Sequence, residues 1–129
     1  IHLYQSFNAD ISKPLDAFAE TMVNDGFDYI ICDAPCSGSG TWSRTPEQLV
    51  FFDKEKIENY TLLQKNIVAN AIQYLLKGGY FLYITCSVFK KENEEVAAFI
   101  QRQLQLVQQQ VLKGYDNNAD TMFAALFKK

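Results

Sequence analysis

Two short apolar runs, separated by a long stretch with helical periodicity, constrain the fold of this 129-residue chain more than any other feature. Phe27 to Cys32 reads FDYIIC, and Tyr80 to Cys86 reads YFLYITC. Runs of this kind are typical of strands buried on both faces of a sheet. Asp53 to Lys77 is predicted as one helix, with an apolar stripe formed by Tyr60, Leu63, Ile67, Ala71 and Leu75. Two parallel strands joined by a helix form a right-handed crossover, so the sequence predicts an α/β fold.

Further segments extend this pattern on both sides. The additional elements expected are a strand at Ile1 to Phe7, a helix that begins at Ser12 and ends at Asn24-Asp25-Gly26, and a helix from Lys91 to about Gln103. The stretch 106–112 is compatible with a helix or a strand, but the turn signal Asp116-Asn117-Asn118 before 121–127 favours a strand, turn and strand ending. We therefore expect one mostly parallel sheet with helices on both faces.

Composition supports a single folded domain. Apolar residues make up 48% of the chain and aromatic residues 14%, which excludes a disordered tail and a disulfide-framed miniprotein. No apolar run approaches the roughly 20 residues that a membrane span needs. The net charge is −3, from 12 basic and 15 acidic residues, and the pI is about 5.1. Nucleic-acid-binding domains usually have a basic face. We therefore expect most of any affinity for nucleic acid to come from residues outside this chain.

The three cysteines carry the first functional signal. An odd number indicates a reducing compartment, the cytoplasm, and no disulfide framework. No metal site is expected either, because the only histidine is His2 at the extreme end of the chain. Cys32 lies within an apolar run and is expected to be buried. Cys36 and Cys86 each follow a predicted strand, at the sheet edge that carries ligands, so neighbouring strands would bring them to a common pocket.

The residues around these cysteines resemble a known family. DAPCSGSGTW (33–42), YITCSVFKKENEE (83–95) and DTMFAALFKK (120–129) are similar to segments of the RNA cytosine-C5 methyltransferases of the Sun/Fmu/NSUN type. In that family one strand ends in a D-A-P-C loop and the next in a T-C-S loop. The resemblance covers essentially the whole chain. It implies a Rossmann-like, S-adenosylmethionine-dependent methyltransferase fold that acts on cytosine in rRNA or tRNA.

The resemblance assigns different roles to the two cysteines. The Cys86 thiolate adds to carbon 6 of cytosine, which makes carbon 5 nucleophilic enough to take the methyl group of S-adenosylmethionine. Cys36 assists removal of the carbon 5 proton and release of the product. A thiol with an ordinary pKa of about 8.5 is only about 3% ionised at pH 7, so we expect the site to lower the pKa of Cys86.

Further site residues follow from the same resemblance. Asp33 is expected to hydrogen-bond the N3 and N4 edge of the cytosine. Asp10, Asp33 and Pro35 are the expected cofactor contacts. Arg44 is a candidate phosphate contact, with a solvated surface arginine as the simpler interpretation. The Gly38-Ser39-Gly40 segment is either an anion-binding loop or, more simply, a flexible one.

The chain lacks a part that the family normally has. Its Gly-rich cofactor loop, of the form D-x-C-A-A-P-G-G-K-T, does not occur in the sequence. If Ile1 to Phe7 corresponds to the family's third strand, the first two strands and any N-terminal RNA-binding domain precede this chain. The strand at Ile1 would then pair directly with 27–32, be displaced, or depend on another chain. We expect weak binding of S-adenosylmethionine by these 129 residues.

Two other functions remain compatible with the sequence. In a DNA-type cytosine-C5 methyltransferase the cysteine of a Pro-Cys pair is the nucleophile, which would make Cys36 catalytic. A non-catalytic α/β binding module is the second alternative. The sequence does not specify which RNA or which cytosine is modified, nor the oligomeric state.

Overall fold

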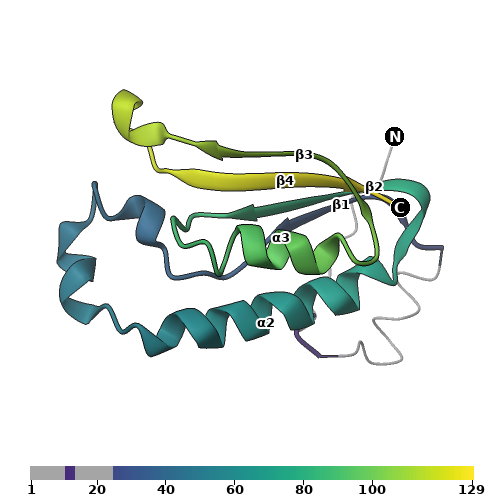
Figure 1. Cartoon of the computed structure of the whole chain (residues 1–129), viewed down its shortest axis with the longest axis horizontal. Helices are drawn as coiled ribbons and strands as arrows, with labels where there is room; N and C mark the ends of the chain where they lie inside the picture. The colour runs from purple at the N-terminus through teal and green to yellow at the C-terminus, as the bar shows by residue number, and fades with distance from the viewer. Residues whose placement is uncertain (1–10, 14–24) are drawn as a thin grey trace, which may run out of the picture.

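The computed structural model describes residues 11–13 and 25–129, which form a four-stranded sheet with its helices on one face (Figure 1). The elements are β1 (Phe27–Asp33), α2 (Glu55–Ile72), β2 (Leu75–Thr85), α3 (Glu94–Ile100), β3 (Gln105–Leu112) and β4 (Met122–Lys128). Three short 3-10 segments connect them: η1 (Ser39–Thr41), η2 (Pro46–Phe51) and η3 (Gly114–Asn117). The predicted strand at Ile1 to Phe7, Asp10, and residues 14–24 of the predicted first helix lie outside the described residues.

The described sheet is mixed, with strand order β1-β2-β4-β3. β1 pairs with β2 in parallel, and β4 pairs antiparallel with both β2 and β3. The predicted strand, turn and strand ending is confirmed as the hairpin β3-η3-β4. The sequence predicted a mostly parallel sheet, but among the described strands only β1 and β2 are parallel. The other pairs are antiparallel, because β3 and β4 form a hairpin and β4 runs opposite to β2.

The core lies between the sheet and the two described helices. Both α2 and α3 lie on the same face, beneath the sheet in Figure 1. Fully buried side chains of the strands and helices that form it are Phe81, Tyr83, Phe123, Phe127, Val68, Val96 and Ile100. Each such side chain contributes about 1.5–3 kcal/mol by leaving water. Within the described residues, no helix is long and apolar enough to cross a membrane.

β1 was expected to be buried on both faces, and this prediction is wrong for the described structure. Tyr29 is 49% exposed and Ile31 64% exposed, whereas Cys32 points into the core and is 7% exposed. The reason is position: β1 is an edge strand of the described sheet, and both described helices cover the face to which Cys32 belongs.

α2 ends earlier than its periodicity predicts. The helix stops at Ile72, and Leu75 belongs to β2, where it pairs with Phe27. Gly78, at φ 85°, accompanies an irregularity in the register of β1 with β2. Leu75 continues the helical spacing of the predicted stripe and is buried, but it is buried as the first residue of β2.

The buried face of α2 is also rotated from the predicted stripe. Its buried residues are Ile57, Thr61, Gln64, Val68, Ala71 and Ile72, whereas Tyr60, Leu63 and Ile67 are only partly buried. Thr61 and Gln64 are polar and were therefore not counted. The Thr61 hydroxyl donates to the Ile57 carbonyl at 2.8 Å, and the Gln64 amide nitrogen donates to the Pro35 carbonyl at 2.9 Å, whereas the Gln64 amide oxygen has no hydrogen-bond partner among the described residues. α3 is likewise shorter than predicted, with turns on both sides.

Candidate active site

The loops that follow β1 and β2 lie side by side at the carboxyl end of the parallel pair. Ala34 N–H donates to the Ile84 carbonyl at 3.0 Å, and Gly40 N–H donates to the Cys86 carbonyl at 2.8 Å. Cys36 and Cys86, fifty positions apart in the sequence, therefore share one edge of the sheet. The expectation that neighbouring strands bring the two cysteine loops together is confirmed.

Gly40 locks the first loop in place. Its carbonyl accepts a hydrogen bond from Thr121 N–H at 2.9 Å, in addition to the bond that its own N–H makes to Cys86. A Cβ here would overlap the Thr121 carbonyl and lie 3.0 Å from that of Cys86. The 38–40 segment is therefore fixed at Gly40, and the interpretation as a flexible loop does not hold there. The Gly40 N–H is also not free to bind an anion, because it donates to the Cys86 carbonyl.

The three free cysteines have different surroundings. Cys32 is buried, and desolvation raises the pKa of its thiol to about 12. Cys36 is partly buried, and burial raises its pKa as well. Hydrogen bonds from the backbone N–H groups of Gly38 and Cys86 to the Cys36 sulfur oppose that rise. The Cys36 sulfur thus lies against the backbone of the second cysteine.

The pKa of Cys86 is raised, first by burial and then by the negative charges of Asp33 and Asp120. The expectation that the site lowers this pKa is therefore wrong for the described residues. The first cause is burial of the thiol, and the charged groups that act on Cys86 add to it because they are carboxylates. Asp33 itself is exposed at the end of β1. In the register of β1 with β2 it pairs with Ile84, two residues before Cys86, and its charge acts on that cysteine.

Arg44 is occupied by an ion pair. Its guanidinium donates two hydrogen bonds to the Asp120 carboxylate, at 3.1 and 2.9 Å, and both side chains are substantially exposed. The hydrogen bond from Arg44 lowers the pKa of Asp120. This arrangement agrees with the interpretation of Arg44 as a surface arginine. Its ion pair links the first cysteine loop to the residues just before β4.

A buried polar network beneath the loops was missed from the sequence. Glu92 is fully buried and accepts hydrogen bonds from Ser37 and Ser87, the residues that directly follow the two cysteines. Gln64 on α2 donates to the Pro35 carbonyl at 2.9 Å. The signal was present in the repeated Cys-Ser pair and in the E-N-E segment after T-C-S, but spacing along the chain does not show that these groups meet.

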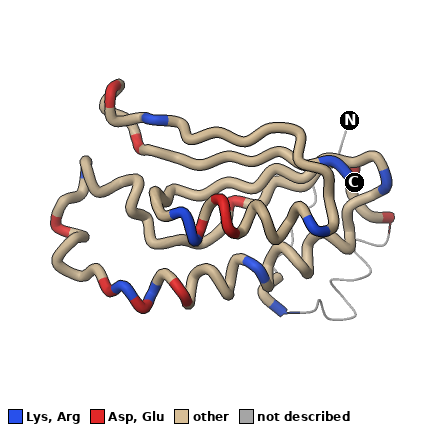
Figure 2. Tube along the Cα trace, in the orientation of Figure 1, with Lys and Arg blue, Asp and Glu red and all other residues tan. Residues whose placement is uncertain are grey.

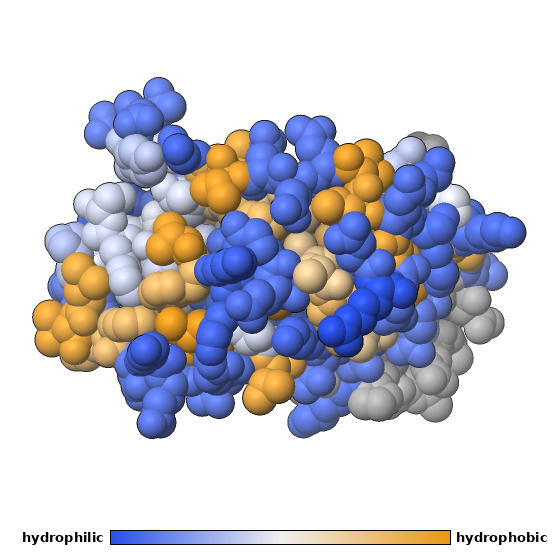
Figure 3. Space-filling view, viewed as in Figure 1, coloured by the Kyte–Doolittle hydropathy of each residue, from blue (hydrophilic) through white to orange (hydrophobic). Residues whose placement is uncertain are grey.

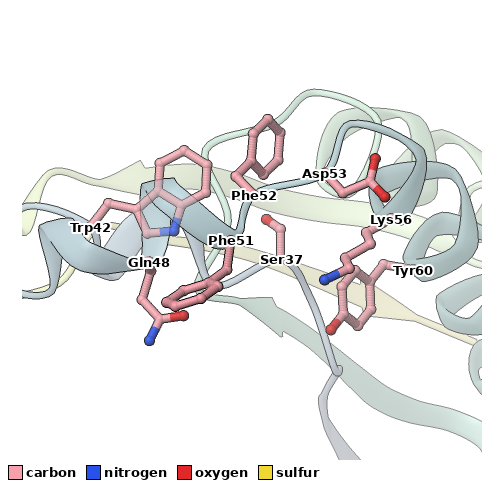
Figure 4. A pocket seen from close by; sticks show the side chains of 8 residues that line it. All are labelled: Ser37, Trp42, Gln48, Phe51, Phe52, Asp53, Lys56 and Tyr60. Atoms are coloured by element: carbon pink, nitrogen blue, oxygen red, sulfur yellow. The ribbon is translucent and has the colours of Figure 1, made fainter.

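An aromatic hollow adjoins the first cysteine loop. Trp42 packs edge-to-face on Phe52 with ring centroids 5.0 Å apart. Phe51, Lys56 and Ser37 line the same hollow, which Figure 4 shows from close by. Exposed apolar side chains gather over η2, at the left of Figure 3. An apolar surface therefore lies directly beside the residues around Cys36.

Charged residues do not form one basic face. Figure 2 shows acidic and basic residues interleaved along the first half of α2 and near α3, with few on the central strands. Among the described residues there is also no group of three or more His, Cys, Asp or Glu side chains that could hold a metal ion.

The fold and this edge together define a Rossmann-like methyltransferase domain. The structure of PH0851 matches 79% of this chain, and 26% of its own length, with a TM-score of 0.75 at 28% identity. NSun6 from Pyrococcus horikoshii, solved with SFG, matches 89% of this chain and 33% of its own length, with a TM-score of 0.73 at 24% identity. The N-methyltransferase NodS from Bradyrhizobium japonicum, in complex with S-adenosyl-L-homocysteine, shares the fold at a TM-score of 0.56 and 15% identity, covering 94% of this chain and 52% of its own.

Within that class, the chain belongs to the family described as 16S rRNA methyltransferase RsmB/F, whose sequence profile matches residues 3–128. A relative named ribosomal RNA small subunit methyltransferase F, from Shewanella loihica, is 36% identical over 72 residues, which are 56% of this chain and 15% of the relative. The protein of the same name from Shewanella amazonensis is 40% identical over 73 residues, 57% of this chain and 16% of its own length. The chain thus spans less than a fifth of the length of these relatives.

Proposed function

We propose that this chain is part of the catalytic domain of an S-adenosylmethionine-dependent RNA cytosine-C5 methyltransferase, with ribosomal RNA as the favoured substrate and tRNA as the other. The observation that carries the proposal is the placement of Cys36 and Cys86 in loops at the ends of adjacent parallel strands, joined by the hydrogen bond from Gly40 N–H to the Cys86 carbonyl at 2.8 Å. The names of the relatives favour ribosomal RNA.

In the proposed reaction Cys86 is the nucleophile. Its thiol gives its proton to solvent as the sulfur bonds to carbon 6 of a flipped-out cytosine, and the electrons of the 5,6 double bond move to carbon 5. Asp33, exposed beside Cys86, hydrogen-bonds the N3 and N4 edge and favours protonation of the ring. After carbon 5 has gained the methyl group, Cys36 takes the carbon 5 proton. The double bond then re-forms, and the bond between carbon 6 and the Cys86 sulfur breaks.

The cofactor supplies the methyl group when it is bound. Asp33 and Pro35 are the described residues that would contact it, since both are exposed at the carboxyl end of β1, whereas Asp10 lies outside the described residues. The first two strands with their Gly-rich loop, and the surface that grips RNA, are proposed to belong to other parts of the protein. Three free cysteines agree with a cytoplasmic location.

One observation favours a second assignment, in which Cys36 is the nucleophile, as in DNA-type cytosine methyltransferases. Burial raises the pKa of both thiols, but the backbone N–H groups of Gly38 and Cys86 oppose the rise at Cys36, whereas Asp33 and Asp120 add to the rise at Cys86. The position of Cys86 in a T-C-S loop on the adjacent strand is better explained by the RNA-type mechanism, which uses both cysteines.

Trapping of a covalent RNA adduct separates the two assignments. The full gene product that contains this chain is incubated with S-adenosylmethionine and RNA containing 5-fluorocytosine, and the adduct is detected by a gel shift resistant to denaturation. Cys86→Ala is expected to abolish the adduct, whereas Cys36→Ala is expected to let it accumulate as the unsubstituted protein does, because fluorine leaves no proton on carbon 5 for Cys36 to remove. Cys32→Ala, which removes a buried thiol away from the site, serves as the control and should form the adduct.

The opposite pattern, with adduct lost in Cys36→Ala and retained in Cys86→Ala, supports the Cys36 assignment. Absence of any adduct and of any methyl transfer by the unsubstituted protein on ribosomal and transfer RNA would contradict the enzymatic proposal and favour a binding module.

A further inference from the structure

A buried carboxylate lies beneath the two cysteine loops and has no part in the chemistry proposed above. Glu92 is fully buried, between β2 and α3. Its Oε1 accepts hydrogen bonds from Ser37 N–H at 2.8 Å and from the Gln64 amide at 3.3 Å. Its Oε2 accepts the hydroxyls of Ser37 at 2.7 Å and Ser87 at 2.5 Å. Four donors therefore converge on this one side chain.

The convergence follows from a repeated pair in the sequence. Each of the two cysteines is directly followed by a serine, and the two serine hydroxyls meet on the same oxygen of Glu92. A serine hydroxyl has one proton to donate, so both directions are set by the acceptor-only carboxylate. Ser39 completes the network: its hydroxyl lies 3.1 Å from that of Ser37 and accepts Val88 N–H at 2.9 Å.

Glu92 is itself fixed from outside the loops. Its backbone carbonyl accepts the hydroxyl of Tyr83, a core residue of β2, at 2.7 Å. The next residue, Asn93, accepts the Thr85 hydroxyl at 2.5 Å and donates to the Ser87 carbonyl at 2.7 Å. The carboxylate is thus anchored to the central strand, and through it the sheet holds both cysteine loops.

A buried carboxylate is a costly way to join two loops, because removing its charge from water is compensated only when every lone-pair direction is filled. Charge-assisted hydrogen bonds are short and strongly directional, so they fix geometry more closely than apolar packing does. The hydrogen bonds to Glu92 are therefore suited to fixing the positions of the two cysteine loops, and not only to stabilising the fold.

We infer that Glu92 is a positioning residue that sets the placement of the Cys36 thiol relative to the Cys86 thiol by binding the serine that follows each. Its importance for catalysis rests on the proposed function, in which one thiol must reach carbon 6 while the other reaches the proton on carbon 5. A misplacement of about 1 Å in such a site can cost about 10²-fold in rate.

The placement of the two thiols can be measured without RNA or cofactor. Diamide oxidises two nearby thiols to a disulfide and takes up their two hydrogens. In the full gene product, the rate of Cys36–Cys86 disulfide formation is followed by mass spectrometry of the linked peptides. Glu92→Gln places an NH2 group among the four donors, and it is expected to slow this rate by tenfold or more. Glu95→Gln, at an exposed carboxylate three residues further on in the first turn of α3, is the matched control and should keep the original rate.

A rate in Glu92→Gln that equals or exceeds that of the unsubstituted protein overturns the inference. If Glu92→Gln does not fold, Ser37→Ala and Ser87→Ala decide, because each removes one hydroxyl donor and leaves the carboxylate with the others. Each is expected to slow disulfide formation severalfold, and unchanged rates in both overturn the inference.

Methylation kinetics then separate the positioning role from the proposed function. If both hold, Glu92→Gln lowers kcat for RNA about 10²-fold with KM unchanged, because the residue touches neither RNA nor cofactor. If the unsubstituted protein methylates no RNA but Glu92→Gln still slows disulfide formation, the proposed function fails and the positioning role stands. A lowered kcat with an unchanged disulfide rate refutes the positioning role and leaves the proposed function intact.

Discussion

At the scale of single residues, the two cysteines are held in unlike electrostatic surroundings although they share one sheet edge. Burial raises the pKa of both thiols; backbone N–H groups oppose that rise at Cys36, whereas the charges of Asp33 and Asp120 add to it at Cys86. The guanidinium of Arg44 is bound to Asp120 in an ion pair. Cys86 is therefore kept mainly as a thiol near neutral pH, and its proton must leave as attack on the base begins.

Asp33→Asn tests this account. After burial, the carboxylate of Asp33 is the next cause that raises the pKa of Cys86, so removing its charge should lower that pKa toward its ordinary value. At pH 8, below that value, the thiolate fraction rises about tenfold for each unit by which the pKa falls. We expect severalfold faster alkylation of Cys86 by iodoacetamide, measured by mass spectrometry across pH 7 to 10.

Asp28→Asn is the matched control for this measurement, because Asp28 is an exposed carboxylate toward the other end of the same strand. It should leave the alkylation profile of Cys86 unchanged. If Asp33→Asn reacts at the original rate or more slowly, the carboxylate does not act on Cys86 as described.

At the scale of elements, the positions of the described strands could be predicted from the sequence, but the buried faces of β1 and α2 could not. β1, β2 and the C-terminal hairpin appear close to their predicted positions because apolar runs and turn signals are local properties. The placement of Cys36 and Cys86 at one edge followed from the strand pattern. The buried face of α2 did not follow, since Gln64 is buried by hydrogen bonds to groups that lie far away in the sequence. Glu92 was missed for the same physical reason.

A pair of substitutions on α2 tests which pattern governs stability. Gln64 is fully buried, and Leu62, two residues earlier, is 61% exposed. Gln64→Leu, although apolar, should lower the free energy of unfolding by about 1–3 kcal/mol, because the Pro35 carbonyl and Glu92 lose a donor. Leu62→Gln should change it by no more than about 0.5 kcal/mol. Urea unfolding followed by circular dichroism measures both, and a stabilising Gln64→Leu would show that the buried amide is dispensable.

At the scale of the whole molecule, the chain carries the proposed chemistry without an obvious grip on its substrates. Its net charge is −3, and basic and acidic residues are interleaved along the described surface. It spans 15% of the length of the Shewanella loihica relative. RNA affinity depends on phosphate contacts from clustered cations, so it is expected to come from other parts of the protein.

Most of the affinity for the cofactor is likewise expected to come from other parts of the protein. The described part of the edge offers Asp33 and Pro35 to S-adenosylmethionine, and the sequence has no loop of the form D-x-C-A-A-P-G-G-K-T. A few contacts at an exposed edge support a Kd of about 1 mM or weaker, equivalent to about −4 kcal/mol. Isothermal titration calorimetry on the 129-residue chain should therefore detect little or no heat of binding, whereas the full gene product should bind measurably under the same conditions. Micromolar binding by the chain alone, about −8 kcal/mol, would mean that these residues hold most of the cofactor site.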